Sequence, residues 1–397
     1  MINQLNTQRI LSIDALRGIT ILVMIFVNEV AGVGGIPPWM KHMPADADAM
    51  TFVDVVFPSF LFIVGMSIPF AINNRIAKGD NVWQLQIHII WRTIGLLVLG
   101  VFMVNTEGGY NEAAMGMSIS LWAFLFYVSA ILVWNVYTFK NKIFTYICKA
   151  AGVIGLVSLA AIYRAGESGT AYMQPHWWGI LGLIGWAYLA SSLLYQLWRG
   201  RIWGLFLSIV ICTGIYIIGS WPGADAAGLG WTEMLKGHAA HTSIVLSGMV
   251  LSLIFFDQQK ARTSQQRFTQ AFVFTAVLFI AGYVLRPYYT ISKIWATPTW
   301  CFYSAGICSL LFAFLYWLID LQKQSSWTSF LRPAAANPLL IYILPGILYN
   351  LWHILHISFP PEMFRYGLPG IIWCAAYAIL LMWVVKGLNK LKIRLQL

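Results

Sequence analysis

The sequence predicts an all-α, polytopic integral membrane protein. Hydrophobic residues make up 59% of its 397 residues and charged residues only 10%, whereas a soluble domain carries about 25% charged residues. The mean hydropathy is +0.71. The apolar residues fall in runs of about 20, which is the length of an α-helix that crosses a bilayer. No loop is long enough to hold a soluble domain, so we expect one transmembrane domain over 1–397.

Apolar runs bounded by polar turns predict about 10–12 transmembrane helices. The runs cover residues 10–30, 52–73, 85–104, 117–137, 143–163, 177–198, 202–220, 239–256, 268–289, 299–319, 336–356 and 368–386. The short N-terminal segment 1–8 is polar and lacks a cleavable signal pattern, so we expect the first run to be a retained helix that directs insertion.

The basic residues predict the orientation of these helices. They gather in every second loop, at Arg9, 75–78, 140–142, 199–201, 260–267, 323–332 and 390–394. By the positive-inside rule these loops and both termini are cytoplasmic. The formal net charge of +11 therefore reflects topology, and we expect no nucleic-acid partner. The opposite loops, which include 31–50, face outward.

Cysteine and histidine spacing predicts no metal site. The five cysteines lie in apolar stretches without a CxxC pair, and the histidines form no HExxH motif. Buried apolar packing accounts for such cysteines better than metal or disulfide chemistry does.

Residues 9–70 hold most of the residues that point to chemistry. Asp14 and Arg17 are three residues apart in the first run, and Asn28 and Glu29 close it. An ionisable residue inside a membrane is normally paired or faces a cavity. Asp14 and Arg17 lie on one helical face, so a structural ion pair and a ligand contact are both open interpretations.

The loop 31–50 and the start of the second run add further candidates. The loop contains Trp39, Lys41 and His42, its single histidine, and Asp54 opens the next run. Trp39 suits either a membrane interface or the apolar face of a sugar ring. Histidine as a residue type has an unperturbed pKa of about 6.5, so its imidazole can act as a base near neutral pH.

Four later clusters also carry polar groups in apolar surroundings. They are His88 with Arg92, His238 with His241, Arg286 with Lys293, and the outer histidines His353 and His356. His88 and Arg92 share a helical face; they suit either a pair that reaches the lipid headgroups or a contact to phosphates of a cytosolic cofactor.

Several of these motifs resemble the heparan-alpha-glucosaminide N-acetyltransferase family and its bacterial relatives. The resemblance covers the first seventy residues, recurs over 291–342 and is weak between them. The residues that carry it are 12–18 (SIDALRG), 24–28, Lys41-His42, 54–65 (DVVFPSFLFIVG), Lys293, Trp295, Thr297, Pro298 and 337–342 (NPLLIY).

The resemblance implies a membrane acetyltransferase of the bacterial inner membrane. Such an enzyme takes acetyl from cytosolic acetyl-CoA and delivers it across the bilayer to an amino sugar or glycan. The family's essential histidine lies in the first outer loop, the position of His42, and Asn28 matches an asparagine that ends the preceding span. His238 and His241 stand where many relatives have an acidic stretch, which leaves the acceptor open.

Acetyl transfer to an amine requires a base or an acyl carrier, and donors for the oxyanion. We expect His42 to be the general base or a transient acetyl carrier, and Asn28 to be the donor. The other expected site residues divide by ligand. For acetyl-CoA they are Asp14, Arg17, Asp54, His88, Arg92, Lys293 and Asn337; for the acceptor they are Trp39, Lys41, Glu29, His238, His241 and Arg286. The sequence leaves a homodimer open.

A secondary transporter of a small polar solute or sugar is the alternative, because about twelve helices with both ends inside is also a transporter topology. Against it, the polar groups lie at the ends of the runs and in the outer loop, whereas a transporter favours sites at the midplane. A scaffold without catalysis would have no need of His42.

Overall fold

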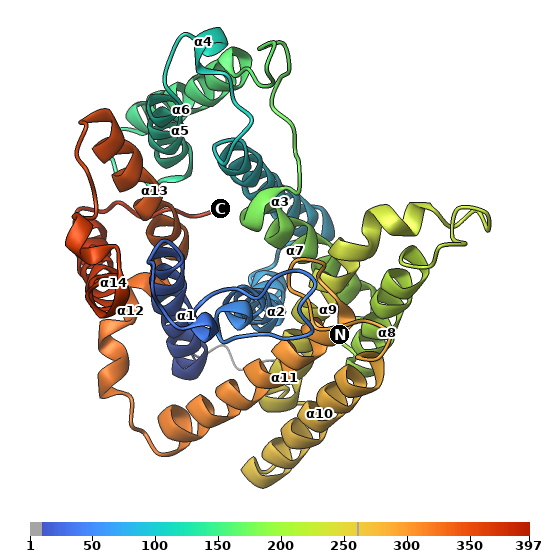
Figure 1. Cartoon of the computed structure of the whole chain (residues 1–397). Helices are drawn as coiled ribbons and strands as arrows, with labels where there is room; N and C mark the ends of the chain where they lie inside the picture. The colour runs from blue at the N-terminus through green and yellow to red at the C-terminus, as the bar shows by residue number, and fades with distance from the viewer. Residues whose placement is uncertain (1–9, 260–261) are drawn as a thin grey trace. The chain divides into compact units, whose positions relative to one another are not determined.

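The computed structural model describes residues 10–259 and 262–397, which form an all-α protein (Figure 1). Within them, helices alternate with loops that form only isolated β-bridges. Arg9 and Lys260, two of the basic residues used to predict orientation, lie outside the described residues. The cytoplasmic placement of the termini stays a prediction.

The helices are joined by connections of very different length, and the one from α1 to α2 covers 31–52. The α-helices are α1 (Leu11–Val30), α2 (Val53–Ala77), α3 (Val82–Val104), α4 (Glu112–Met115), α5 (Ile119–Trp134), α6 (Lys142–Ile162), α7 (Gly179–Leu197), α8 (Ile202–Gly219), α9 (Trp231–Phe256), α10 (Ser264–Leu285), α11 (Pro298–Leu315), α12 (Arg332–Ala336), α13 (Pro338–Ile354) and α14 (Gly367–Lys390). Short 3₁₀ turns occur at Pro38–Met40, Ser326–Phe330 and Glu362–Phe364, and a π-helical segment at Tyr316–Leu321 continues α11.

The polytopic membrane fold predicted from hydropathy is confirmed. In the described part of the chain, ten helices are long and apolar enough to cross a membrane, and α5 and α13 are shorter apolar helices. Each of the twelve predicted runs corresponds to one of these helices. One predicted boundary is wrong by a wide margin: α9 begins at Trp231, not at 239. Its first turns mix apolar with charged residues and pair Lys236 with Glu233 at 3.5 Å, so the helix extends beyond its apolar run.

The chain divides into two compact units that each draw on several segments. The first unit contains Met1–Thr20, Pro37–Thr93 and Ile184–Ser329, and the second contains Ile21–Ile36, Ile94–Leu183 and Phe330–Leu397. We describe each unit by itself. The prediction of a single domain over 1–397 stays a prediction.

In the first unit, α9 is the buried central helix and packs against α2, α8 and α11. Two glycines bring the backbones of α2 and α9 together. A Cβ on Gly65 would lie 1.9 Å from the carbonyl oxygen of Val245, and a Cβ on Gly248 would lie 2.0 Å from that of Phe62. Small residues permit such close helix contacts in membrane proteins.

Replacing Gly248 tests whether this contact holds the first unit together. We expect Gly248→Ala to destabilise the protein by about 1–3 kcal/mol, because the added methyl group overlaps backbone that no rotamer change can move. The melting temperature of purified protein in detergent measures the loss. Gly237→Ala on the same helix is the control: a Cβ there meets nothing within 4 Å. Equal melting temperatures for the two variants would contradict the close contact.

In the second unit, α5 packs on α6 and on α13, and α13 contacts α14. The indole N–H of Trp122 on α5 donates to the carbonyl of Leu159 on α6 at 2.9 Å. Trp122 is fully buried beside Phe102 and Phe126. This aromatic core anchors the helix pair.

Candidate active site

The loop before α2 holds His42 against a buried carboxylate. His42 Nδ1 lies 2.7 Å from Asp54 Oδ1; the Asp54 side chain is 2% exposed and that of His42 is 39% exposed. An ionised carboxylate only accepts hydrogen bonds. We therefore assign the imidazole proton to Nδ1, which leaves the lone pair of a neutral ring on Nε2.

Backbone groups of the same loop orient the second carboxylate oxygen. Asp54 Oδ2 accepts from the N–H of Thr51 at 3.0 Å and from the N–H of Met43 at 3.3 Å. The Thr51 hydroxyl donates to the carbonyl of Lys41 at 2.9 Å and accepts from the N–H of Val53 at 3.2 Å. The loop is therefore folded around Asp54, and Asp54 fixes the ring of His42.

Lys293 joins this pair from a loop 251 residues further along the chain. Its Nζ lies 3.1 Å from His42 Nε2 and 3.2 Å from Nδ1. Because Nδ1 already donates to Asp54, the ammonium group can donate only to Nε2. Burial lowers the pKa of Lys293, and the charge of Asp54 acts in the opposite direction. The structure thus brings together three of the predicted site residues.

A second contact between the same two loops is centred on Asp48. Asp48 Oδ1 accepts from the N–H of Ile291 at 2.8 Å, and its Oδ2 accepts from Arg286 Nε at 2.9 Å. The bond from Ile291 is the main cause that lowers the pKa of Asp48, and Arg286 adds to it. Arg286 was expected to bind the acceptor; its guanidinium is engaged with Asp48, and a role in acceptor binding stays a prediction.

Trp300 fixes the backbone of Asp54. Pro58 lies one helical turn after Asp54 and has no N–H, so the Asp54 carbonyl lacks its normal partner in α2. The indole N–H of Trp300 donates to that carbonyl at 3.1 Å, and Trp300 is fully buried. Pro58 thus leaves the Asp54 carbonyl without a donor in α2, and Trp300 of α11 donates to it instead.

The two histidines of α9 lie elsewhere in the first unit. His241 is buried and packs edge-on against Phe57, with ring centroids 5.3 Å apart, and lies 6.2 Å from the ring of Trp300. His238 is half-buried beside the ring of Trp186, at 5.9 Å. Neither Nδ1 has a partner in the described residues. Trp300 therefore stands between His241 and Asp54.

The polar groups of α1 to α3 in the first unit contact other residues of that unit. Arg17 Nη1 lies 3.2 Å from Asp14 Oδ1, and its Nη2 donates to the hydroxyl of Ser67 at 3.0 Å. This is the ion pair expected from their spacing, and it ties α1 to α2. His88 and Arg92 have different contacts.

His88 Nδ1 lies 3.0 Å from Arg75 Nη2, whereas Arg92 lies over the ring of Tyr188 at 4.9 Å. Arg75 also pairs with Asp80. Arg92 Nε is buried without a hydrogen-bond partner among the described residues, and phosphate binding by His88 and Arg92 stays a prediction.

Three predicted site residues belong to the second unit. Asn28 is exposed near the end of α1, and Glu29 accepts a hydrogen bond from the hydroxyl of Tyr349. Asn337 is fully buried and donates to Asn389 Oδ1 at 2.9 Å. Asn337 also accepts from the N–H of Leu395 at 3.1 Å, so it anchors the C-terminal segment.

The remaining two lie in the His42 loop. Trp39 is 59% exposed and tilts against Phe52, with ring centroids 6.0 Å apart. Lys41 is half-buried and contributes its carbonyl to the bond from Thr51. Trp39 therefore keeps an accessible indole on the same loop as His42.

Sequence reasoning did not single out Asp48, Thr51 or Trp300. Thr51 was recognisable, because a Thr with an acidic residue three positions later is a helix-start signature. Pro58 signalled an unpaired carbonyl at Asp54. Nothing in the sequence identified Trp300 as its partner or paired Asp48 with Ile291, because both contacts join distant segments.

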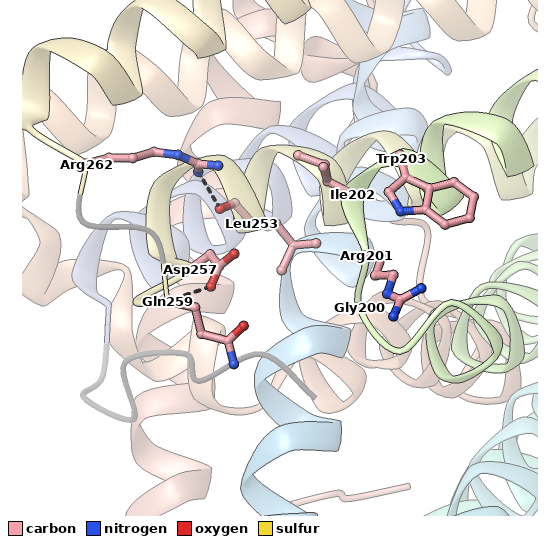
Figure 2. Close-up of a pocket in the computed structure, with 8 residues that line it drawn as sticks. All are labelled: Gly200, Arg201, Ile202, Trp203, Leu253, Asp257, Gln259 and Arg262. Atoms are coloured by element: carbon pink, nitrogen blue, oxygen red, sulfur yellow. Dashed lines mark hydrogen bonds between the residues drawn. The ribbon is translucent and has the colours of Figure 1, made fainter. Parts of the chain in front are cut away.

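A cavity in the first unit lies apart from these residues, between the start of α8 and the end of α9 (Figure 2). Its volume of about 190 Å³ is below the roughly 300 Å³ at which ligand pockets begin. Arg262 in its wall donates to the carbonyls of Leu253 and Ile254 at 3.1 and 2.9 Å. Arg262 thus caps the end of α9.

A double-mutant cycle tests the role of Trp300. We expect Trp300→Phe to destabilise the protein by about 1–3 kcal/mol, because it leaves the buried Asp54 carbonyl without a donor. Pro58→Ala restores an N–H that can bond this carbonyl within α2. In the Pro58→Ala background, Trp300→Phe should therefore cost much less. Additive losses of melting temperature across the cycle would rule this coupling out.

Part of the sequence is similar to known acetyltransferases. The chain is 37% identical to human (Homo sapiens) heparan-alpha-glucosaminide N-acetyltransferase over 98 residues and 34% identical to the mouse (Mus musculus) enzyme over 101 residues. These stretches cover 24% and 25% of this chain and 14% of each relative. The resemblance seen in the motifs is confirmed.

A domain of unknown function, DUF5009, matches residues 9–224. Because this match covers more than half of the chain, the protein belongs to the DUF5009 family.

Proposed function

We propose that this protein is a membrane acetyltransferase that moves acetyl from cytosolic acetyl-CoA to the amine of an amino sugar or glycan at the outer face of a bacterial inner membrane. The observation that carries the proposal is the contact of His42 with Asp54 and Lys293. The local similarity to the human and mouse enzymes supports the reaction class.

Asp54 and His42 act together in this mechanism. The buried Asp54 holds the Nδ1–H tautomer, so Nε2 is the reactive nitrogen. A histidine oriented by a carboxylate in this way can remove a proton from an attacking group and return it to the leaving group. It can also attack an acyl group itself.

As a general base, His42 takes a proton from the acceptor amine while the amine nitrogen attacks the thioester carbonyl. The C–N bond forms, the C–S bond breaks, and the proton passes to the sulfur to give the free thiol of CoA. As a carrier, Nε2 attacks the thioester carbonyl first, the C–S bond breaks, and the sulfur leaves as a thiolate. The amine nitrogen then attacks the acetyl group, the bond between acetyl and Nε2 breaks, and the proton that the amine loses passes to the thiolate. Both routes use Nε2.

Lys293 supplies positive charge beside this nitrogen. A cation placed where an oxyanion or thiolate develops stabilises the transition state. Its hydrogen bond to Nε2 must break before His42 reacts, which frees the ammonium group for the developing charge. Asn28 remains our proposed second donor, on the basis of the family resemblance.

Transfer of radiolabelled acetyl from acetyl-CoA to a panel of amino sugars tests the proposal with purified protein in lipid. We expect label on at least one acceptor with the wild type, and a loss of about 10²–10⁴-fold with His42→Ala because the base is removed. His176→Ala, which changes an exposed histidine of another loop, should keep wild-type activity. No transfer to any acceptor, or full activity of His42→Ala, would refute the proposal.

Asp54→Asn tests the orientation of the ring. The amide can donate to Nδ1 and so favours the wrong tautomer, with the proton on Nε2. We expect kcat to fall by about 10²–10⁴-fold, with little change in the KM for acetyl-CoA. An equal fall in kcat for Thr51→Ala would instead indicate general loss of the loop structure, so the melting temperatures of both variants are measured alongside.

A further inference from the structure

A carboxylate bonded to a cluster of aromatic side chains lies in the second unit. It is Glu29 near the end of α1, with Tyr349 and Trp352 of α13 and Trp373 and Tyr377 of α14. We call these five residues the Glu29 cluster. Phe359 of the loop between α13 and α14 packs against their rings.

The contacts within the Glu29 cluster hold its rings at steep angles. The hydroxyl of Tyr349 donates to Glu29 Oε2. The ring of Tyr349 lies perpendicular to that of Trp352, with centroids 5.5 Å apart, and 6.4 Å from that of Tyr377. Glu29 is thus bonded to one member of a group of large aromatic rings that pack on one another.

Two donors of the cluster have no partner among the described residues. They are the hydroxyl of Tyr377, which is only 3% exposed, and the indole N–H of Trp373. Buried tyrosine and tryptophan side chains usually find a hydrogen-bond partner, and each exception calls for an explanation. If Glu29 served only to tie α1 to α13, its bond with Tyr349 would suffice and these two donors would remain unexplained.

The chemistry of the cluster selects a ligand class. A carboxylate beside aromatic faces favours an organic ammonium ion. The free hydroxyl and indole N–H require acceptor oxygens on the same ligand, and an indole packs well on the apolar face of a sugar ring. An amino sugar carries all three features.

We propose that the Glu29 cluster binds an amino sugar through its ammonium group, with sugar hydroxyl oxygens accepting from Tyr377 and Trp373. The inference rests on the proposed function in taking a sugar as the carrier of the amine. The cluster is built wholly from residues of the second unit, and its test needs no acetyl transfer.

Equilibrium dialysis with radiolabelled glucosamine measures this binding directly. The protein carries His42→Ala, contains no acetyl-CoA, and is kept near neutral pH, where much of the amine is protonated. We expect saturable binding that glucosamine displaces about tenfold or more better than N-acetylglucosamine or glucose do, because neither competitor carries the charge. Glu29→Gln should weaken binding by about tenfold or more, and Tyr377→Phe by a smaller factor.

Glu362→Gln is the matched control, because Glu362 is exposed on the adjacent loop of the same unit. It should bind glucosamine as the parent does, and melting temperatures show whether each variant is folded. Equal displacement by glucosamine and glucose would overturn the inference, as would unchanged binding in a folded Glu29→Gln variant. No saturable binding of glucosamine, together with binding of phosphatidylethanolamine that Glu29→Gln weakens, would overturn the inference and assign the cluster to a lipid headgroup. Binding without any acetyl transfer by the wild type would refute the proposed function alone.

Discussion

The buried carboxylate of Asp54 is the constraint on which the candidate active site depends. An ionised group at 2% exposure is costly unless hydrogen bonds surround it. Two loop N–H groups and the ring of His42 supply them, so the loop has to close over the start of α2. The requirement to satisfy one charge therefore sets both the path of the loop and the tautomer of the histidine.

α11 and the loop before it contact α2 because one carbonyl of α2 lacks a donor within its own helix. Pro58 removes the normal donor for the Asp54 carbonyl, and Trp300 at the start of α11 fills the place. The loop before α11 carries Lys293, and Asp48 bonds to Ile291 within it. The bond from Trp300 to Asp54 and the bond from Ile291 to Asp48 thus hold the Lys293 loop against the His42 loop. α9 is buried, and Gly65 and Gly248 lie where it contacts α2. This close contact keeps the two helices at a fixed spacing.

The fold was predictable from the sequence because hydrophobic length alone decides which segments can cross a bilayer. All twelve apolar runs are helices, whereas the start of α9 was misplaced because its first turns mix apolar with charged residues. His42, Asp54 and Lys293 were recognisable by resemblance to a family, and their mutual contact was not. Pairing across 251 residues depends on helix packing, which no local pattern encodes. The contacts of Trp300 and Asp48 could not be predicted for the same reason.

The geometry around His42 also limits any mechanism that uses this residue. Asp54 occupies Nδ1, so only Nε2 can accept a proton or an acyl group, and Lys293 donates to Nε2 in this structure. A reacting group therefore has to displace the lysine from the ring nitrogen. Burial already lowers the pKa of Lys293, which weakens its hold on a proton. A lysine displaced in this way can follow the negative charge to the carbonyl oxygen or the departing sulfur. A base mechanism and a carrier mechanism would then differ only in which atom first occupies the position that Lys293 leaves.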